Sequence, residues 1–302
     1  MQFLICGIVF CLGGASAIAA EPLTELRDGW RGTEATAMIA EDTTALASPY
    51  SDDVWIMPEY QQTAVGPDKA RAYYDAYFQR FDIVGFEKIP GEVFEIADVT
   101  VEIGTFSIRQ FLRDDGSAHD WTGTYFDVWQ GDAADAALLS RSWNYDKAYE
   151  GARELAHFDD IGGIPAPNLP GVAVTDPLDY EIAALKTYGE WLMTSQQPGL
   201  LNLVYAEDGM YSPHDTPMVW GREAIRAHLA EYTANWPPFT FVDVETHRLI
   251  VGEFGILDYG SYNLRWIGED ETGVSMGKGL RIWKRSDEGQ LQYFRQISMH
   301  DF

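Results

Sequence analysis

The chain repeats one pattern of residues, and this duplication constrains the fold more than any other feature. Tyr50–Pro58 (YSDDVWIMP) aligns with Tyr205–Pro213 (YAEDGMYSP), 155 positions later and without a gap. The same offset carries Arg71 onto Arg226 and Tyr77 onto Tyr232. Chance similarity rarely keeps its order over such a distance with so little slippage. A period of 155 residues is too long for a solenoid and predicts two similar domains.

Further along the chain the offset changes by only one residue in either direction. Gly104–Arg109 aligns with Gly260–Arg265 at an offset of 156. At an offset of 154, three residues of the first copy align with three of the second: Gly123, Trp129 and Arg141 with Gly277, Trp283 and Arg295. We therefore expect the first domain at residues 21–150 and the second at residues 178–302. The segment 151–177 between them is rich in Pro and Gly and is predicted to be an ordered or semi-rigid linker.

The first twenty residues have the features of a secretory signal peptide. They carry no charged side chain, and an apolar run ends in Ala17-Ile18-Ala19-Ala20, a small-residue cleavage pattern. The alternative is an uncleaved membrane anchor, since ~20 apolar residues can span a bilayer. Signal cleavage predicts a secreted or periplasmic protein. Both cysteines, Cys6 and Cys11, lie in this segment, so thiol chemistry is excluded from the rest of the chain.

The charge balance argues against two classes of partner. With 47 Asp and Glu against 21 Lys and Arg, the formal net charge is −26. Such a surface repels phosphate backbones and anionic lipids, so no nucleic-acid or membrane partner is expected. The sequence also lacks a dinucleotide or Walker glycine loop, a Gly-x-Ser-x-Gly elbow and the ligand spacings of zinc and EF-hand sites. We therefore predict no cofactor and no metal.

Each copy places helices before strands, which predicts an α+β fold. Helices are predicted from Pro177, over 200–205, from Gly221 and, in the first copy, from Pro67. After Pro238 the apolar period becomes two and predicts antiparallel strands. The beginning of the first copy fits less well, because Gly29 and Gly32 interrupt a helical pattern. This predicts a first helix that is short, broken or displaced.

These motifs together resemble a known family. The stretches 205–213, 221–225 (GREAI), 277–283 (GKGLRIW) and the final His300-Asp301 look like the SnoaL-like and DUF4440 branch of the nuclear transport factor 2-like (NTF2-like) superfamily, and the first copy carries weaker versions. The resemblance implies two cone-shaped domains, each with N-terminal helices packed in a curved antiparallel sheet around an apolar pocket. It does not settle the function, because this family includes isomerases, cyclases, dehydratases and members without chemistry.

The resemblance also suggests where chemistry would occur. The family's isomerases place an aspartate base beside the proline of the first motif, but here Met57 and Ser212 precede the two prolines, so the isomerase set is incomplete. In the second copy the candidate catalytic residues are Tyr188 on the first helix, His214 and Asp215 after the proline, and His300 on the last strand. Their alternatives are helix packing, a solvated loop and an ordinary chain end.

Five further residues are candidates for substrate binding: Glu59, Arg109, Asp127, Arg265 and Trp283. Arg109 and Arg265 occupy equivalent strand positions and could bind a carboxylate, although a surface ion pair explains them as well. The acidic pairs Asp52-Asp53 and Glu207-Asp208 invite a calcium interpretation, but their recurrence favours structural capping. Ten Trp, 16 Tyr and 15 Phe suit a pocket for flat molecules, or simply two well-filled cores.

We interpret the chain as an exported tandem protein that binds a small apolar or aromatic molecule and converts it by cofactor-free acid–base chemistry, with the second copy carrying the site. The alternative is a non-catalytic module for ligand binding or protein assembly. Single domains of the family commonly pair through their sheets, so the two copies could form an internal pseudo-dimer. Small-angle scattering should then give one compact particle, whereas two separated lobes would contradict this hypothesis.

Overall fold

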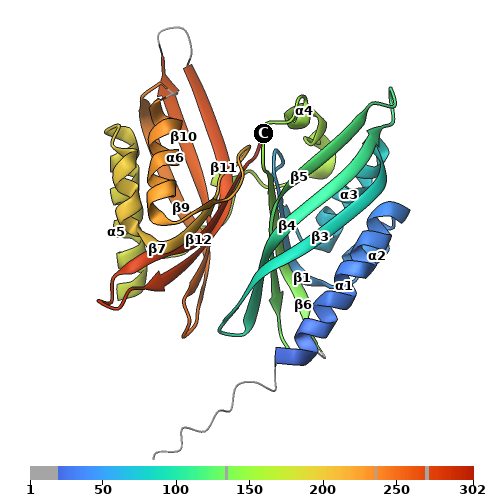
Figure 1. Ribbon diagram of the computed structural model, residues 1–302, viewed down its shortest axis with the longest axis horizontal. Helices are drawn as coiled ribbons and strands as arrows, with labels where there is room; N and C mark the ends of the chain where they lie inside the picture. Colours follow the sequence, from blue (N-terminus) through green and yellow to red (C-terminus); the bar gives the residue numbers. More distant parts are fainter. Residues whose placement is uncertain (1–19, 133–134, 235–236, 269–271) are drawn as a thin grey trace, which may run out of the picture.

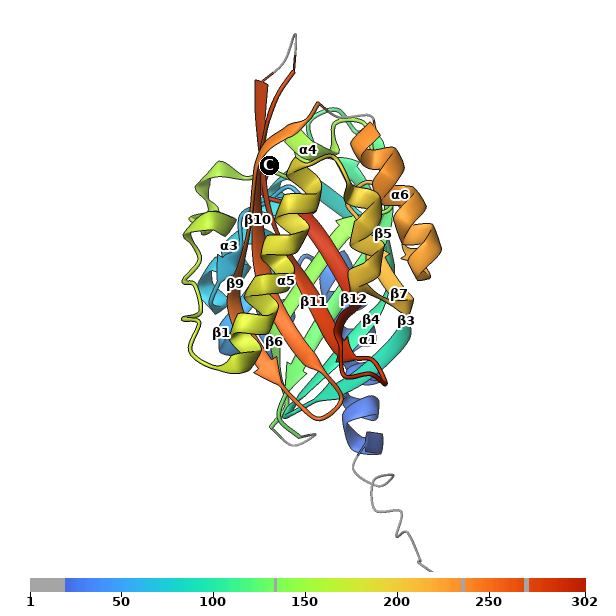
Figure 2. The same cartoon turned by 90° about the vertical axis from the view of Figure 1, so that its left-hand side faces the viewer.

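A computed structural model describes residues 20–132, 135–234, 237–268 and 272–302 of the chain. The predicted signal peptide falls almost entirely on residues 1–19, which lie outside the described residues. Two six-stranded sheets stand next to each other, and the long helices cover their outer faces (Figures 1 and 2). Among the described helices, none combines the length and the apolar character needed to cross a bilayer.

The first domain begins with two helices and contains six strands. Its elements are α1 (Ala20–Ala40), α2 (Thr43–Ala47), β1 (Tyr50–Pro58), β2 (Ala64–Val65), α3 (Pro67–Arg80), β3 (Phe81–Ile96), β4 (Val99–Leu112), β5 (Ala118–Gln130) and β6 (Ala137–Tyr145). The predicted linker holds three short helices: α4 (Ala152–Leu155), η1 (Asp159–Ile161) and η2 (Ala166–Asn168). Its Phe158 and Ile161 are buried in the first domain and its Leu169 between the two sheets, so this segment is ordered by packing.

The second domain repeats this order. It contains α5 (Pro177–Thr194), η3 (Pro198–Val204), β7 (Tyr205–Ser212), β8 (Val219–Trp220), α6 (Arg222–Ala234), β9 (Phe239–Val251), β10 (Ile256–Ile267), β11 (Thr272–Arg285) and β12 (Leu291–His300). The predicted helix from Pro177 is confirmed. Asp176 caps it by accepting hydrogen bonds from the backbone of Leu178 and Asp179.

The two sheets have the same strand order, β2-β1-β6-β5-β4-β3 and β8-β7-β12-β11-β10-β9. The α+β prediction of two similar domains is therefore confirmed. One detail differs from a purely antiparallel sheet, because the first and last long strands of each domain, β1 with β6 and β7 with β12, pair in parallel. The remaining neighbours are antiparallel.

The prediction of a short or broken first helix is wrong. α1 runs for 21 residues without interruption and carries Gly29 and Gly32 in its interior. A glycine in the interior of a helix lowers its stability by only about 1 kcal/mol relative to alanine. The helix lies along the first sheet and buries Trp30, Glu34 and Met38 against it, and this packing outweighs the cost.

The strand register corrects one detail of the sequence alignment. Asp127 on β5 pairs with Arg141, whereas Arg281, the equivalent of Asp127, pairs with Gln296. Arg141 therefore corresponds to Gln296 and not to Arg295, and the offset in the last strand is 155. It follows that Tyr145 corresponds to His300, since they pair with the equivalent glycines Gly123 and Gly277.

These two glycines recur for a steric reason. A Cβ atom on Gly123 would lie 1.9 Å from the carbonyl oxygen of Asn144, and one on Gly277 would lie 2.1 Å from that of Met299. In each domain an aromatic ring of the neighbouring strand also covers the glycine, Phe106 in the first domain and Tyr262 in the second. Only glycine fits between the ring and the next strand.

The inner faces of the two sheets meet in one buried hydrophobic cluster. It draws Trp55, Val101 and Phe126 from the first domain together with Leu257 and Tyr259 from the second, among others. The rings of Trp55 and Tyr259 are 5.6 Å apart in an edge-to-face arrangement, and the Tyr259 hydroxyl hydrogen-bonds Ser140 at 2.8 Å. This contact joins the domains through the faces opposite their helices (Figure 1).

Candidate functional site

The second domain contains an open cavity of about 280 Å³ between its helices and its sheet. Its walls are mostly aromatic and aliphatic, with several ionisable groups among them. The lining includes Lys186, Glu190, Leu201, Tyr205, Tyr211, His214, Asp215, His228, Leu229, Tyr232, Val244, Tyr262, Leu264, Arg281, Tyr293, Gln296 and His300. An apolar hollow with a few converging polar groups is the usual form of a small-molecule site.

Two histidines and a carboxyl group from the other domain form the centre of the site. The rings of His214 and His300 lie 3.7 Å apart, centroid to centroid, at an angle of 61°. Oε1 of Glu59 is 2.9 Å from His300 Nδ1 and accepts a hydrogen bond of 3.1 Å from the His300 backbone N–H. In the tautomer in which Nδ1 donates to this carboxyl group, the lone pair of the neutral imidazole resides on Nε2.

Burial keeps Glu59 and His300 uncharged near neutral pH. Glu59 is completely buried, and burial raises the pKa of its carboxyl group to about 8, although Lys278 and the protonated form of His214 oppose the shift. Burial also lowers the pKa of His300 to about 4 and lowers the pKa of His214 below its ordinary value. The site therefore presents neutral imidazoles, which are bases.

The site forms where equivalent corners of the two domains meet. Glu59 and Tyr60 follow Pro58 in the first domain just as His214 and Asp215 follow Pro213 in the second. The Tyr60 hydroxyl donates a hydrogen bond of 2.6 Å to Asp215, and the Tyr60 ring stacks parallel to His300 at 6.0 Å. Tyr60 and Asp215 both have left-handed backbone φ values, 60° and 53°, so the two corners turn alike.

A second group of polar side chains, behind the wall of the cavity, surrounds Asp258 of β10. This buried carboxylate accepts hydrogen bonds from Arg281 Nη1 at 3.2 Å, from Trp283 Nε1 at 3.1 Å and from Thr246 at 3.0 Å. The amine of Lys186 lies 3.7 Å from its Oδ2. Arg281 and Lys186 both line the cavity.

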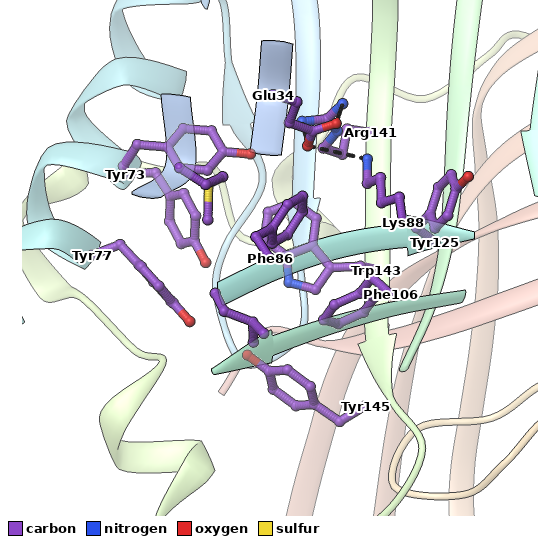
Figure 3. A pocket seen from close by; sticks show the side chains of 13 residues that line it. Glu34, Tyr73, Tyr77, Phe86, Lys88, Phe106, Tyr125, Arg141, Trp143 and Tyr145 are labelled. Atoms are coloured by element: carbon purple, nitrogen blue, oxygen red, sulfur yellow. Dashed lines mark hydrogen bonds and ion pairs between the residues drawn. The ribbon is translucent and has the colours of Figure 1, made fainter. Parts of the chain in front are cut away.

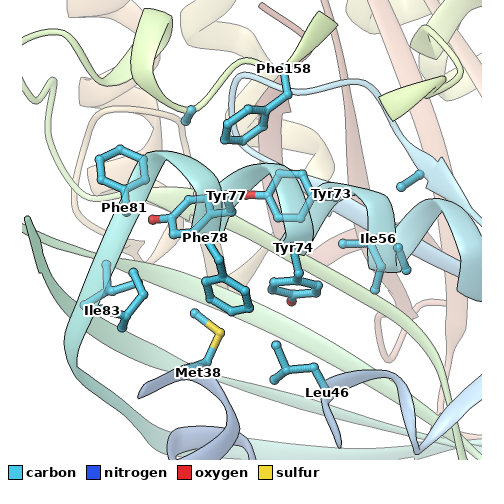
Figure 4. Close-up of a cluster of buried hydrophobic side chains, with 14 of the residues drawn as sticks. Met38, Leu46, Ile56, Tyr73, Tyr74, Tyr77, Phe78, Phe81, Ile83 and Phe158 are labelled. Carbon is cyan, nitrogen blue, oxygen red and sulfur yellow. The ribbon is translucent and has the colours of Figure 1, made fainter. Parts of the chain in front are cut away.

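The matching space in the first domain is almost filled. Its cavity has a volume of about 40 Å³, room for roughly one water molecule. Aromatic side chains converge on it from β3 to β6 and α3, among them Tyr73, Phe106, Tyr125, Trp143 and Tyr145 (Figure 3). Tyr73, Tyr77, Phe78 and Phe158 continue this packing above α1 and α2 (Figure 4).

The difference in volume follows from substitutions at equivalent positions. With the corrected register, Tyr125 and Trp143 of the first domain correspond to Gly279 and Ser298 of the second. Tyr145 is replaced by His300 in the same way, and Tyr73 by His228 at the offset of 155. The second domain thus exchanges bulky rings for small or titratable side chains, which both opens the cavity and supplies its bases.

A buried network of four charged groups lies beside the filled cavity of the first domain. Arg141 binds Asp127 through Nε and Nη2 at 2.9 and 3.0 Å and binds Glu34 of α1 through Nη1 at 2.5 Å. Lys88 Nζ completes the network at 2.8 Å from Asp127 and 3.3 Å from Glu34. Although burial favours the neutral acid, these cations hold the pKa of Asp127 below its ordinary value. Asp127, predicted to bind substrate, is saturated by structural partners.

Four other candidates lie outside the two cavities. Tyr188 packs against Trp191 and the cluster around η3, and Arg109 forms an exposed ion pair with Asp120 at 2.9 Å. Arg265 is exposed, with its guanidinium 4.9 Å from the Phe241 ring centroid. Trp283 is fully buried behind the cavity, where it holds Asp258. None of these side chains lines the open cavity, so we do not propose ligand contacts for them.

Sequence reasoning missed several residues of the site. Tyr60 and Lys186 belong to otherwise ordinary helical or loop patterns, and Lys278 stands within a glycine-rich strand motif. Lys278 is fully buried and donates hydrogen bonds to the carbonyl oxygens of Gln61 and His300 and to Asp301. A lysine at an inward position of a strand is the one signal that could have identified it. Over the described ranges, no three His, Cys, Asp or Glu residues gather in a way that could hold a metal ion.

Three solved structures that resemble parts of this chain share little sequence with it. No family model and no curated protein matches the chain. A ketosteroid isomerase-like protein from Erwinia carotovora atroseptica SCRI1043 shares 16% identity with a TM-score of 0.38 and covers 41% of this chain and 96% of its own. A hexachlorocyclohexane dehydrochlorinase (LinA) Type2 shares 13% identity with a TM-score of 0.38, and the alignment covers 43% of this chain and 89% of that protein. ActVI-ORFA from Streptomyces coelicolor shares 12% identity with a TM-score of 0.34, and the alignment covers 42% of this chain and 98% of that protein.

Each of these alignments covers somewhat less than half of this chain and most of the compared chain. The same strand order and the same order of helices and strands are present twice, which establishes two α+β domains of one topology in tandem and agrees with the fold expected from the sequence motifs. The chemistry of the site is a separate question and depends on its own residues.

Proposed function

We propose that the second domain binds a small apolar or aromatic molecule in its open cavity and removes a proton from it, with His300 as the general base. The observation that carries this proposal is the pair formed by His300 and the buried Glu59 at the wall of an apolar cavity. A base that is desolvated and held by a second group in one tautomer is suited to abstract a proton from carbon. No cofactor takes part in this step.

His214 has a supporting role in this proposal. Its ring lies against that of His300, and its Nδ1 is 3.6 Å from Asp215 Oδ2. After proton transfer the imidazolium of His300 would lie near the carboxylate of Asp215, which favours a positive charge, and beside the buried Glu59. Isomerisation, elimination and cyclisation all begin with such a step. The names of the similar structures, an isomerase-like protein and a dehydrochlorinase, suit this class of reaction.

The pH dependence of catalysis tests the proposal directly. As a probe we choose 5-nitrobenzisoxazole, a flat bicyclic molecule that opens to a coloured cyanophenolate when a base removes its carbon-bound proton and its N–O bond breaks. Because the pKa of His300 is about 4, the base is neutral throughout the range from pH 5.5 to 7.0. We expect a nearly constant rate over this range, measured by absorbance. An ordinary imidazole would lose activity about eightfold from pH 7.0 to 5.5.

Two results would contradict this function. One is a rate that falls with pH as for an ordinary imidazole, and the other is a rate that does not depend on His300. Binding of the probe without ring opening, measured by quenching of tryptophan fluorescence, would favour the alternative of a non-catalytic ligand-binding module.

We also propose that the protein is exported and that its domains act as an internal pseudo-dimer. Export is supported by the sequence of the first twenty residues alone. The pseudo-dimer is supported by the hydrophobic cluster shared by the two sheets and by the meeting of the equivalent corners at Glu59 and His214. In this arrangement the nearly solid first domain supplies Glu59 and Tyr60 to the site of the second.

A further inference from the structure

Three lysines in the described part of the chain have side chains that are at most 5% exposed, and their surroundings differ. Lys88 forms ion pairs with both Asp127 and Glu34. Lys278 donates hydrogen bonds to two backbone carbonyl groups and to Asp301. The charge of each of these two lysines is therefore matched by close partners, as is usual for a buried cation.

The positive charge of Lys186 on α5 has fewer close partners than the charges of Lys88 and Lys278. Its nearest carboxylate oxygen, Oδ2 of Asp258, is 3.7 Å away and already accepts hydrogen bonds from Arg281 and Trp283. One carboxylate thus serves two buried cations. Glu190 also lines the cavity, but its Oε1 accepts a hydrogen bond from the backbone of Val244 at 2.9 Å. Burial and the neighbouring charge of Arg281 both favour the neutral amine of Lys186.

The side chain of Lys186 lies at the wall of two hollows. Lys186 lines the open cavity and also a second hollow of about 260 Å³ bounded by residues 171–174, α5 and β9. By contrast, Lys278 lines neither hollow. A desolvated lysine next to another cation, at the wall of an apolar cavity, is the setting in which lysine acts as a nucleophile toward carbonyl groups.

We propose that Lys186 captures small aldehydes or ketones in the cavity of the second domain by forming a reversible imine. Its Nζ lone pair attacks the carbonyl carbon, and one proton passes from the nitrogen to the carbonyl oxygen to give a carbinolamine. The hydroxyl group then leaves with the second nitrogen-bound proton as one water molecule, which gives the C=N bond. This activity goes beyond proton abstraction by His300 and does not depend on it. It assigns the cavity a substrate class, carbonyl compounds with an apolar or aromatic body.

The acid–base behaviour of Lys186 agrees with this role. Burial lowers the pKa of its amine to about 8, with Arg281 adding to the shift and Asp258 and Glu190 opposing it. At pH 7 roughly one tenth of such an amine is neutral, which is ~100-fold or more above the fraction for an exposed lysine. Asp258, Arg281 and Glu190 are the charged side chains that shift the pKa of Lys186, and the titratable His247 also interacts with its charge.

The test is reductive trapping with benzaldehyde as the probe. The full-length protein is treated at pH 7 with benzaldehyde and sodium cyanoborohydride, which reduces the imine to a stable benzylamine, and the modified lysines are mapped by peptide mass spectrometry. We expect the adduct on Lys186 to exceed that on the exposed Lys69 and Lys147 at least tenfold. Labelling of Lys186 should level off above about pH 8, while that of Lys69 should continue to rise.

Variants separate this reaction from surface labelling. Lys186→Arg keeps the positive charge beside Asp258 and should lose the preferred adduct, whereas the matched control Lys147→Met should keep it. Equal or weaker labelling of Lys186 relative to Lys69 and Lys147 in the wild-type protein would overturn the proposal, and this result needs no variant that folds. Because the adduct is detected on the lysine itself, the outcome is independent of whether 5-nitrobenzisoxazole is converted.

Discussion

Replacing His300 by alanine should lower the rate of ring opening of 5-nitrobenzisoxazole about 100-fold. Positioned general bases contribute roughly 10²–10⁴-fold to catalysis. We expect the lower end of this range, because burial lowers the pKa of His300 to about 4 and so weakens it as a base. The measurement is the initial rate at pH 7 at equal concentrations of wild-type and variant protein.

Two further variants make this experiment decisive. His300→Asn retains a side-chain donor for Glu59 while it removes the basic nitrogen, so it should lose activity with little loss of stability. His119→Ala is the control, because it also replaces a histidine by alanine. His119 belongs to the first domain, where it lies beside Ser117 and away from the open cavity, so this substitution should leave the rate unchanged. A rate that survives in both His300 variants would assign the proton transfer to another group.

Replacing Arg141 by methionine should destabilise the first domain by about 3 kcal/mol or more. Arg141 holds Glu34 of α1 and Asp127 of β5, and the side chains of all three are at most 4% exposed. Removing one partner of a buried ion pair typically costs about 3–5 kcal/mol because the remaining charge stays buried without compensation. Lys88 contacts both carboxylates, but its single positive charge balances only one of the two negative charges. The measurement is the free energy of unfolding in urea, followed by circular dichroism.

The control is Arg109→Met on β4 of the same sheet. The Arg109 side chain is 67% exposed and its partner Asp120 is 65% exposed, so their ion pair should contribute less than about 0.5 kcal/mol. Similar losses for the two substitutions would show that the buried network around Arg141 does not stabilise the domain. A large loss for Arg109→Met alone would mean that Arg109 has a role that its exposed position does not suggest.

Features encoded by neighbours along the chain were predicted well. The capping residue Asp176 followed by Pro177 marks the beginning of α5, and the period-two pattern around Tyr262 and Leu264 predicts β10. The long helix α1 was predicted wrongly because Gly29 and Gly32 weaken its local signal. Its stability comes from Trp30, Glu34 and Met38, whose partners lie far away in the sequence.

The candidate site was predicted only in part. His214, Asp215 and His300 do line one cavity, whereas Tyr188 lies outside it. Glu59 was considered as a substrate ligand of its own domain, but it lies 241 positions before His300 and reaches it across the domain contact. No local pattern predicts such a pairing, because it depends on how two separately folded sheets come together.

The sequence by itself determined that there are two domains, the order of their elements and the small repeated residues, because duplication and short-range periodicity are written along the chain. The tertiary structure alone decided which domain keeps an open interior and which groups meet there. Cavity volume depends on side chains from several strands and a helix that meet in space, and the corners at Glu59 and His214 come together only when the two sheets pack face to face.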